Sequence, residues 1–121
     1  MVQLISNPAI IKAAGNKEKI IKEFFGGVNS KTSEVSIAMM KSPQGWEEPG
    51  QCPEFNEYTV VLKGSLKIKT RKQVYIVSEG MGILTTSNEW VQYSSPFEGG
   101  AEYIAICLPA FSPDIVHRDN I

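Results

Sequence analysis

The stretch GQCPEFNEYTVVLKGSLKI, Gly50–Ile68, indicates the type of fold. From Glu57 onward it is rich in β-branched and aromatic residues, and only Gly64 interrupts this pattern before SLKI continues it. Such residues favour strands, and a glycine between two strand-like runs is typical of a tight hairpin turn. The stretch therefore predicts two paired strands, with Glu57 and Thr59 on one face of the first strand and Tyr58 on the other.

Runs of the same kind extend over residues 35–109, separated by Gly, Pro, Ser or Asn. They are SEVSIAMMK, EYTVVLKG, SLKIKT, KQVYIVSEG, MGILTT, WVQYSSP and AEYIAICLP. Short strands at this close spacing predict an all-β sandwich or barrel. The longest connection, KSPQGWEEPGQCPEFN, covers residues 41–56 and is either a functional lid or a crossover packed by Trp46.

The two ends of the chain differ from this central part. The segment SNPAIIKAAG predicts a short helix over residues 8–14, because Asn7 suits an N-cap, a proline follows at the first helical position, and Gly15 suits the end. The next segment, KEKIIKEFFGG, fits either a helix or a strand. Residues 110–121 are expected to form an ordered tail with a short helical turn at Asp114.

Composition limits the classes of partner. The 121 residues, which we take as one domain, include 12 Lys and Arg against 13 Asp and Glu, and no long run of like charge occurs. We therefore expect neither nucleic acid nor a membrane as a partner. The start of the chain lacks a secretory pattern, and no stretch is long enough to span a membrane. Because Cys52 and Cys107 do not make a disulfide framework, we expect a cytoplasmic protein with reduced thiols.

Spacing within the opening stretch resembles the first motif of the cupins, which are small jelly-roll barrels. The core of that motif is His, any residue, His, four residues, Glu, six residues and Gly. Glu57 and Gly64 match it, and Pro53 stands where a proline often follows the second histidine. The two histidine positions fall on Gly50 and Cys52.

The second cupin motif is matched more weakly. It begins with a glycine, here Gly80, and its later positions fall on Thr86, Asn88, Val91 and Ser95. Only the glycine is identical. The fifteen residues between the two motifs are a separation typical of compact microbial cupins.

The resemblance covers roughly residues 35–109 and implies a fold. We expect an all-β, cupin-like jelly-roll barrel over this range, preceded by the short helix at about 8–14 and followed by the tail at 110–121. Cupins often pair barrels through their sheets, so the resemblance also implies a homodimer, for which Phe24 and Phe25 are candidate interface residues.

In metal-binding cupins, three histidines and one glutamate hold a divalent ion inside the barrel. Carried over to this chain, that set becomes Gly50, Cys52, Glu57 and Val91. Glycine and valine have no side-chain donor atom, so we expect no metal cofactor. The carboxyl group of Glu57 would then lie in the barrel without a cation, and burial should raise its pKa.

The leading hypothesis is a small-molecule-binding barrel for a sugar-like or organic-acid ligand. An inward carboxyl group of raised pKa suits a general acid or base, and it also suits a ligand anchor or a structural role. Glu57 is therefore the candidate catalytic residue, and whether the protein is an enzyme stays open. The candidate ligand-binding residues are Gln51, Cys52, Glu54, Glu57, Tyr93 and Trp46.

Two alternatives remain. The first is a metal-dependent enzyme, a dioxygenase or an isomerase, with the unusual ligands Cys52, Glu57 and His117, the last being the only histidine of the chain. The second is a structural or regulatory module whose interior is filled by side chains.

Overall fold

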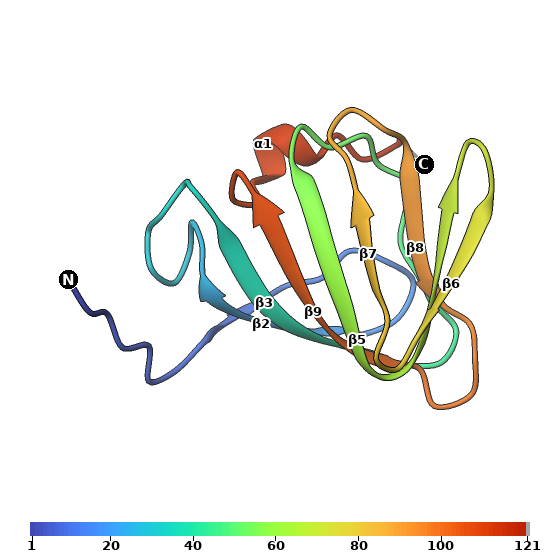
Figure 1. Ribbon diagram of the computed structural model, residues 1–121, viewed down its shortest axis with the longest axis horizontal. Helices are drawn as coiled ribbons and strands as arrows, with labels where there is room; N and C mark the ends of the chain where they lie inside the picture. Colours follow the sequence, from blue (N-terminus) through green and yellow to red (C-terminus); the bar gives the residue numbers. More distant parts are fainter. Residues whose placement is uncertain (121) are drawn as a thin grey trace.

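The computed structural model describes residues 1–120, and nearly all of its regular structure is β-strand. Figure 1 shows the strands side by side in a curled antiparallel sheet, with one short helix lying across their upper end. The elements are β1 Ala9–Ile11, β2 Ile20–Phe25, β3 Ser36–Ser42, β4 Trp46–Glu47, β5 Asn56–Thr70, β6 Val74–Ser78, β7 Gly82–Thr85, β8 Val91–Ser95, β9 Ala101–Leu108 and α1 Pro113–Val116. The expected all-β barrel is confirmed.

Strand β5 connects the two halves of the barrel. It runs unbroken through Gly64, where φ is 74° and an added Cβ would lie 2.0 Å from the carbonyl oxygen of Gly100. Residues before this point pair with β7 and β9, and residues after it pair with β6 and β8. The predicted hairpin at Gly64 is therefore wrong. A glycine that tolerates positive φ bends one long strand from the first group of strands into the second.

The sheet order is β1-β2-β3-β9-β5-β8-β4, with β6 and β7 each paired to β5. Alternation along β5 is as expected: Thr59 and Val61 are buried, whereas Tyr58 is exposed. The larger core cluster lies between the two groups of strands and contains Trp46, Val61, Leu66, Ile68, Val77, Val91, Tyr93, Ala101 and Tyr103. Glu57 shares the inward face of β5 with these core residues.

The predicted N-terminal helix at about residues 8–14 is wrong. Ala9–Ile11 forms strand β1, whose residues pair with Ile21–Glu23 of β2. A helix of two turns is marginal in water, whereas pairing along β2 satisfies the same backbone groups. The ambiguous segment that follows is strand β2, and residues 12–19 between the two strands pass behind the barrel in Figure 1.

The C-terminal tail, which contains α1, covers the upper end of the barrel in Figure 1. Helix α1 begins after Ser112, whose hydroxyl accepts a hydrogen bond from the Asp114 amide, as the short helical turn predicted there requires. Its residues Ile115 and Val116 pack with Phe55, Cys107 and Phe111 in a second hydrophobic cluster. Within residues 1–120, no helix has the length and apolarity needed to cross a bilayer.

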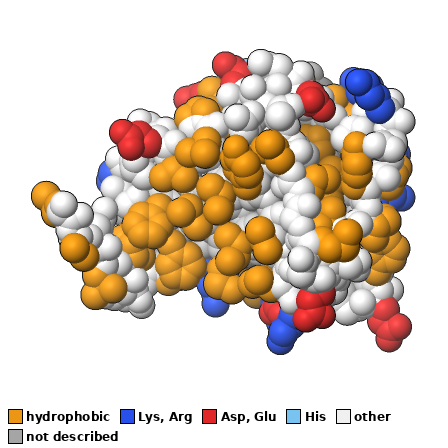
Figure 2. Space-filling model, viewed as in Figure 1, with side chains coloured by type: hydrophobic (Ala, Val, Ile, Leu, Met, Phe, Trp, Pro, Cys, Tyr) orange, Lys and Arg blue, Asp and Glu red, His pale blue; other side chains and the backbone are white. Residues whose placement is uncertain are grey.

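The outer face of strands β3, β9, β5 and β7 is apolar. Figure 2 shows its hydrophobic side chains gathered over these strands. Cross-strand pairing brings the following side chains to one face: Ile37, Met39, Tyr58, Val60, Leu84, Ile104 and Ile106. Tyr58, Val60, Met39 and Leu84 are exposed. Phe25 lies opposite Ile37 and extends this outer apolar face onto β2.

Candidate functional site

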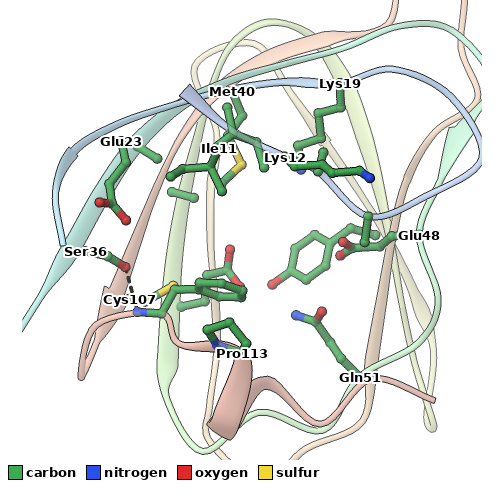
Figure 3. A pocket seen from close by; sticks show the side chains of 18 of the residues that line it. Ile11, Lys12, Lys19, Glu23, Ser36, Met40, Glu48, Gln51, Cys107 and Pro113 are labelled. Carbon is green, nitrogen blue, oxygen red and sulfur yellow. Dashed lines mark hydrogen bonds between the residues drawn. The ribbon is translucent and has the colours of Figure 1, made fainter. Parts of the chain in front are cut away.

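The inner faces of the strands enclose a cavity of about 210 Å³ (Figure 3). Its polar lining includes Lys19, Glu48, Gln51, Glu57, Tyr93 and Tyr103, and its apolar lining includes Ile11, Ile21, Met40, Phe55 and Phe111. These residues come from the strands, from the segment between β4 and β5, and from both terminal segments. The cavity is therefore completed by parts of the chain that lie outside the barrel strands.

Glu57 stands near the start of β5, opposite Thr85 of β7 and Cys107 of β9. Burial raises the pKa of its carboxyl group to about 7, and the negative charge of Glu48 acts in the same direction. The positive charge of Lys19 and a hydrogen bond from Tyr93 oppose this rise without cancelling it. Near neutral pH, Glu57 therefore exists in both its protonated and its ionised form.

Glu48 is a second buried carboxyl group, projecting from the segment after β4. Burial raises its pKa, while the positive charges of Lys19 and Arg118 oppose that rise. Neither Glu48 nor Glu57 forms a salt bridge with any residue in the range 1–120. The cavity thus holds two carboxyl groups whose protons are retained to higher pH than usual.

Two tyrosines supply neutral hydroxyl groups. The Tyr93 hydroxyl lies 2.9 Å from Thr85 Oγ1, and the Tyr103 hydroxyl lies 2.8 Å from Ser42 Oγ. Burial raises the pKa of both phenols, so both stay protonated at neutral pH. Because the Tyr93 hydroxyl donates its one proton to Glu57, its oxygen can only accept further hydrogen bonds.

Gln51 lies between β4 and β5 and is only 4% exposed. Its backbone amide donates to the Val91 carbonyl oxygen over 2.9 Å, and the Val91 amide donates back over 2.8 Å. This pairing fixes the residue beside β8. Figure 3 shows its side-chain amide pointing toward the centre of the cavity, and its Oε1 has no partner among the described residues.

The structure separates the six predicted ligand-binding residues into two groups. Gln51, Glu57 and Tyr93 line the cavity, whereas Trp46, Cys52 and Glu54 are not among its lining residues. Trp46 is fully buried in the core, and its indole nitrogen donates to the backbone. Cys52 is half-buried, and Glu54 is exposed and pairs with His117 on the surface.

Among the polar lining residues that sequence reasoning missed are Lys19, Glu48 and Tyr103. Strand alternation placed Tyr103 and Cys107 on one face of their strand, but no motif in the sequence showed that this face is the inward one. Glu48 lies in an acidic loop where the sequence marks no one carboxylate as inward. Lys19 precedes a segment that fits a helix or a strand, so its direction depends on the folded structure.

The cupin metal positions do not fit a metal ion. At Gly50 an added Cβ would lie 2.3 Å from the Trp90 ring, so the first histidine position has no room for a side chain. Val91, at the third histidine position, is 1% exposed and belongs to the core. The alternative set of Cys52, Glu57 and His117 is not brought together, since the described residues contain no group of three or more His, Cys, Asp or Glu side chains arranged to hold a metal.

Solved structures with the same architecture identify the fold. An RmlC-like cupin from Shewanella frigidimarina is 13% identical, with a TM-score of 0.72 over 93% of this chain and 94% of that one. This chain has the cupin fold. A predicted oxalate decarboxylase from Thermotoga maritima also shares the cupin fold, at 18% identity, with a TM-score of 0.71 over 90% of this chain and 99% of that one. The EutQ protein of Clostridium difficile is 20% identical, with a TM-score of 0.65 over 77% of this chain and 64% of that one.

No protein-family model matches this sequence. Comparison with curated protein sequences gives one relative. The relative is a protein of Myxococcus xanthus named Endoribonuclease YbeY, which is 37% identical over 102 residues. The match covers 84% of this chain and 35% of that protein. This chain therefore spans about a third of that relative's length, and most of the relative has no counterpart in this cupin-fold chain.

Proposed function

We propose that the protein binds a small polar molecule, of the sugar-like or organic-acid kind, in the barrel cavity, and that Glu57 acts on it as an acid or base. The main support for this proposal is the inward carboxyl group of Glu57, with a pKa of about 7 and the Tyr93 hydroxyl beside it. A general acid or base works best when its pKa lies near the working pH. Glu57 can therefore both give and take a proton at neutral pH.

The size of the cavity supports a small ligand. Pockets for drug-sized molecules usually measure roughly 300 to 1,000 Å³, and this cavity has about 210 Å³. Its walls combine aliphatic and aromatic surface with a few polar groups, as ligand sites commonly do. The cupin fold is compatible with many chemistries, so the fold supports a ligand cavity without choosing the ligand. One structural neighbour is named a predicted oxalate decarboxylase, which is consistent with the organic-acid class.

A binding screen tests this function. Neutral sugars, hydroxy acids, amides and amines are titrated into the ¹⁵N-labelled protein, and shifts of amide signals from Gln51 and Tyr93 are followed. We expect at least one neutral sugar or hydroxy acid to shift these signals, and we expect Glu57→Gln to weaken its binding. The matched control is Glu79→Gln, which makes the same chemical change at an exposed turn residue. Unchanged affinity in Glu57→Gln, or no ligand at millimolar concentration in any class, would count against the proposal.

We also propose that the protein forms a homodimer through its outer apolar face. Exposed apolar patches of monomers rarely exceed a few hundred Å², and larger ones commonly mark interaction sites. Here the exposed Met39, Tyr58, Val60 and Leu84 lie on neighbouring strands around half-buried isoleucines. A second copy of the chain can cover this flat face with the same apolar side chains.

A further inference from the structure

The cavity receives a positive charge from the N-terminal segment. Residues 12–19 cross one side of the barrel, and three hydrogen bonds attach them to β4. The Trp46 indole donates to the Ala14 carbonyl oxygen over 3.0 Å, the Asn16 amide donates to the Glu47 carbonyl oxygen over 3.1 Å, and the Glu47 amide donates to Asn16 Oδ1 over 2.8 Å. These bonds fix the segment that carries Lys19 to the barrel.

Lys19 directs its ammonium group into the cavity region. Its Nζ lies 4.1 Å from the centroid of the Trp46 ring and 5.2 Å from that of Tyr103, and the residue is half-buried. Both aromatic faces stabilise a cation at this position. Its charge opposes the burial-induced rise in the pKa of Glu48 and of Glu57, yet it forms no salt bridge with a residue of the described part of the chain. The ammonium group is therefore held in place but not neutralised by a direct partner.

The cavity also contains hydrogen-bond acceptors that lack a donor or a cationic partner. Gln51 is more than nine-tenths buried, and its Oε1 accepts no hydrogen bond from residues 1–120. Glu48 and Glu57 line the same space without a cationic partner in direct contact. Glu23 also lines the cavity, but its carboxylate already accepts hydrogen bonds from two backbone amides of the loop after β2. Gln51 Oε1 therefore lacks a donor, and the carboxyl groups of Glu48 and Glu57 keep acceptor sites for a ligand that donates hydrogen bonds.

We propose that the natural ligand is a hydroxylated monocarboxylate whose carboxylate contacts Lys19 and whose hydroxyl groups donate to Gln51, Glu48 and Glu57. This inference rests on the proposed function and names the ligand class. One ligand of this kind supplies an acceptor for the ammonium group and donors for the remaining acceptors.

Other ligand classes match these groups less well. A neutral sugar leaves the ammonium group of Lys19 without an anionic partner, and an amine places a second cation beside it. A dicarboxylate brings another negative charge toward Glu48 and Glu57. Arg118 and Lys12 stand at the edge of the cavity, where they are exposed and attract an anion only weakly. Lys19 is thus the residue that sets the preference for a carboxylate.

The test compares acids with their neutral amides. Glycolate with glycolamide, lactate with lactamide, and D-glucuronate with D-glucuronamide are titrated by NMR into wild type, Lys19→Met and Lys19→Arg. D-Glucose and D-glucosamine represent neutral sugars and amines. The matched control is Lys22→Met, which removes an exposed lysine of β2 that does not line the cavity. Lys19→Arg keeps the charge and guards against a result caused by misfolding of Lys19→Met.

In the wild type we expect at least one acid to bind about 10-fold to 100-fold more tightly than its amide, as a charge-assisted hydrogen bond allows. Lys19→Met should remove this preference, whereas Lys19→Arg and Lys22→Met should keep it. Equal binding of acid and amide, or a preference that survives in Lys19→Met, overturns the inference. Binding of glucose or glucosamine without binding of any acid also overturns it while leaving the proposed function standing. Failure of every compound to bind contradicts both proposals.

Discussion

The inward carboxyl group of Glu57 should make the protein less stable as pH rises. In the folded state its pKa is about 7, against an ordinary value of 4.5. Between these two values the unfolded chain releases the proton while the folded protein keeps it. Stability depends on pH through this difference in bound protons, and it falls with rising pH wherever the folded state binds more of them. The loss should therefore begin near pH 4.5 and level off above pH 7.

The magnitude follows from the size of the pKa difference. At about 1.4 kcal/mol per pH unit, a rise from 4.5 to about 7 corresponds to about 3 kcal/mol. This is an upper limit, because Glu57 is half-buried and solvent screens part of the cost. Glu48 adds a contribution of the same sign, since burial also raises its pKa. The neutral amide of Glu57→Gln removes the first contribution, and the double variant with Glu48→Gln removes both.

Urea unfolding at a series of pH values from 4.5 to 8.5 measures the effect. We expect the unfolding free energy of wild type to fall by up to about 3 kcal/mol more than that of Glu57→Gln over this range. The double variant should show the flattest profile, and the exposed-residue control Glu79→Gln should follow the wild type. Parallel profiles of wild type and Glu57→Gln would contradict this prediction, as would a wild-type stability that rises from pH 4.5 to pH 7.

Three further predictions follow from the same contacts. Lys19→Met should raise the pKa of Glu57, because it removes a positive charge that favours the ionised form; ¹³C NMR of the carboxyl carbon measures it, and a lowered or constant pKa contradicts the prediction. Gly50→Ala should cost about 1 to 3 kcal/mol in urea unfolding, because its Cβ would press on the Trp90 ring, and unchanged stability would show that the ring moves freely. Val60→Glu on the outer apolar face should halve the mass found by light scattering, whereas equal masses for variant and wild type would exclude this face as the interface.

The faces on which the side chains of the central strand lie could be predicted from the sequence, because side chains alternate along a strand. Once Glu57 was aligned with the cupin motif, the inward position of Thr59 and the outward position of Tyr58 followed from a period of two. The role of Gly64 could not be read in the same way. A glycine between two strand-like runs suits a turn or a bend equally, and the choice depended on which strands lay beside each half of β5.

In the N-terminal segment, the local helix-start pattern predicted the wrong secondary structure. Asn7 and a following proline favour a helix start, but the backbone of Ala9–Ile11 is paired along β2 instead. Tertiary pairing overrode a weak local preference. The pairing of β1 with β2 also determines where Lys19 lies, because the segment between them crosses the cavity only when both are strands.

The all-β class, the inward Glu57 and the lack of histidine ligands could be inferred from the sequence, because they depend on residue types along the chain and on the spacing of the two cupin motifs. The tertiary structure decided the site. Lys19, Gln51 and Tyr103 come from separate parts of the chain, and they meet only because the barrel closes and both terminal segments cover it. Charges and hydrogen-bonding groups act through distances in space, and no period along the sequence encodes those distances for segments that the fold brings together.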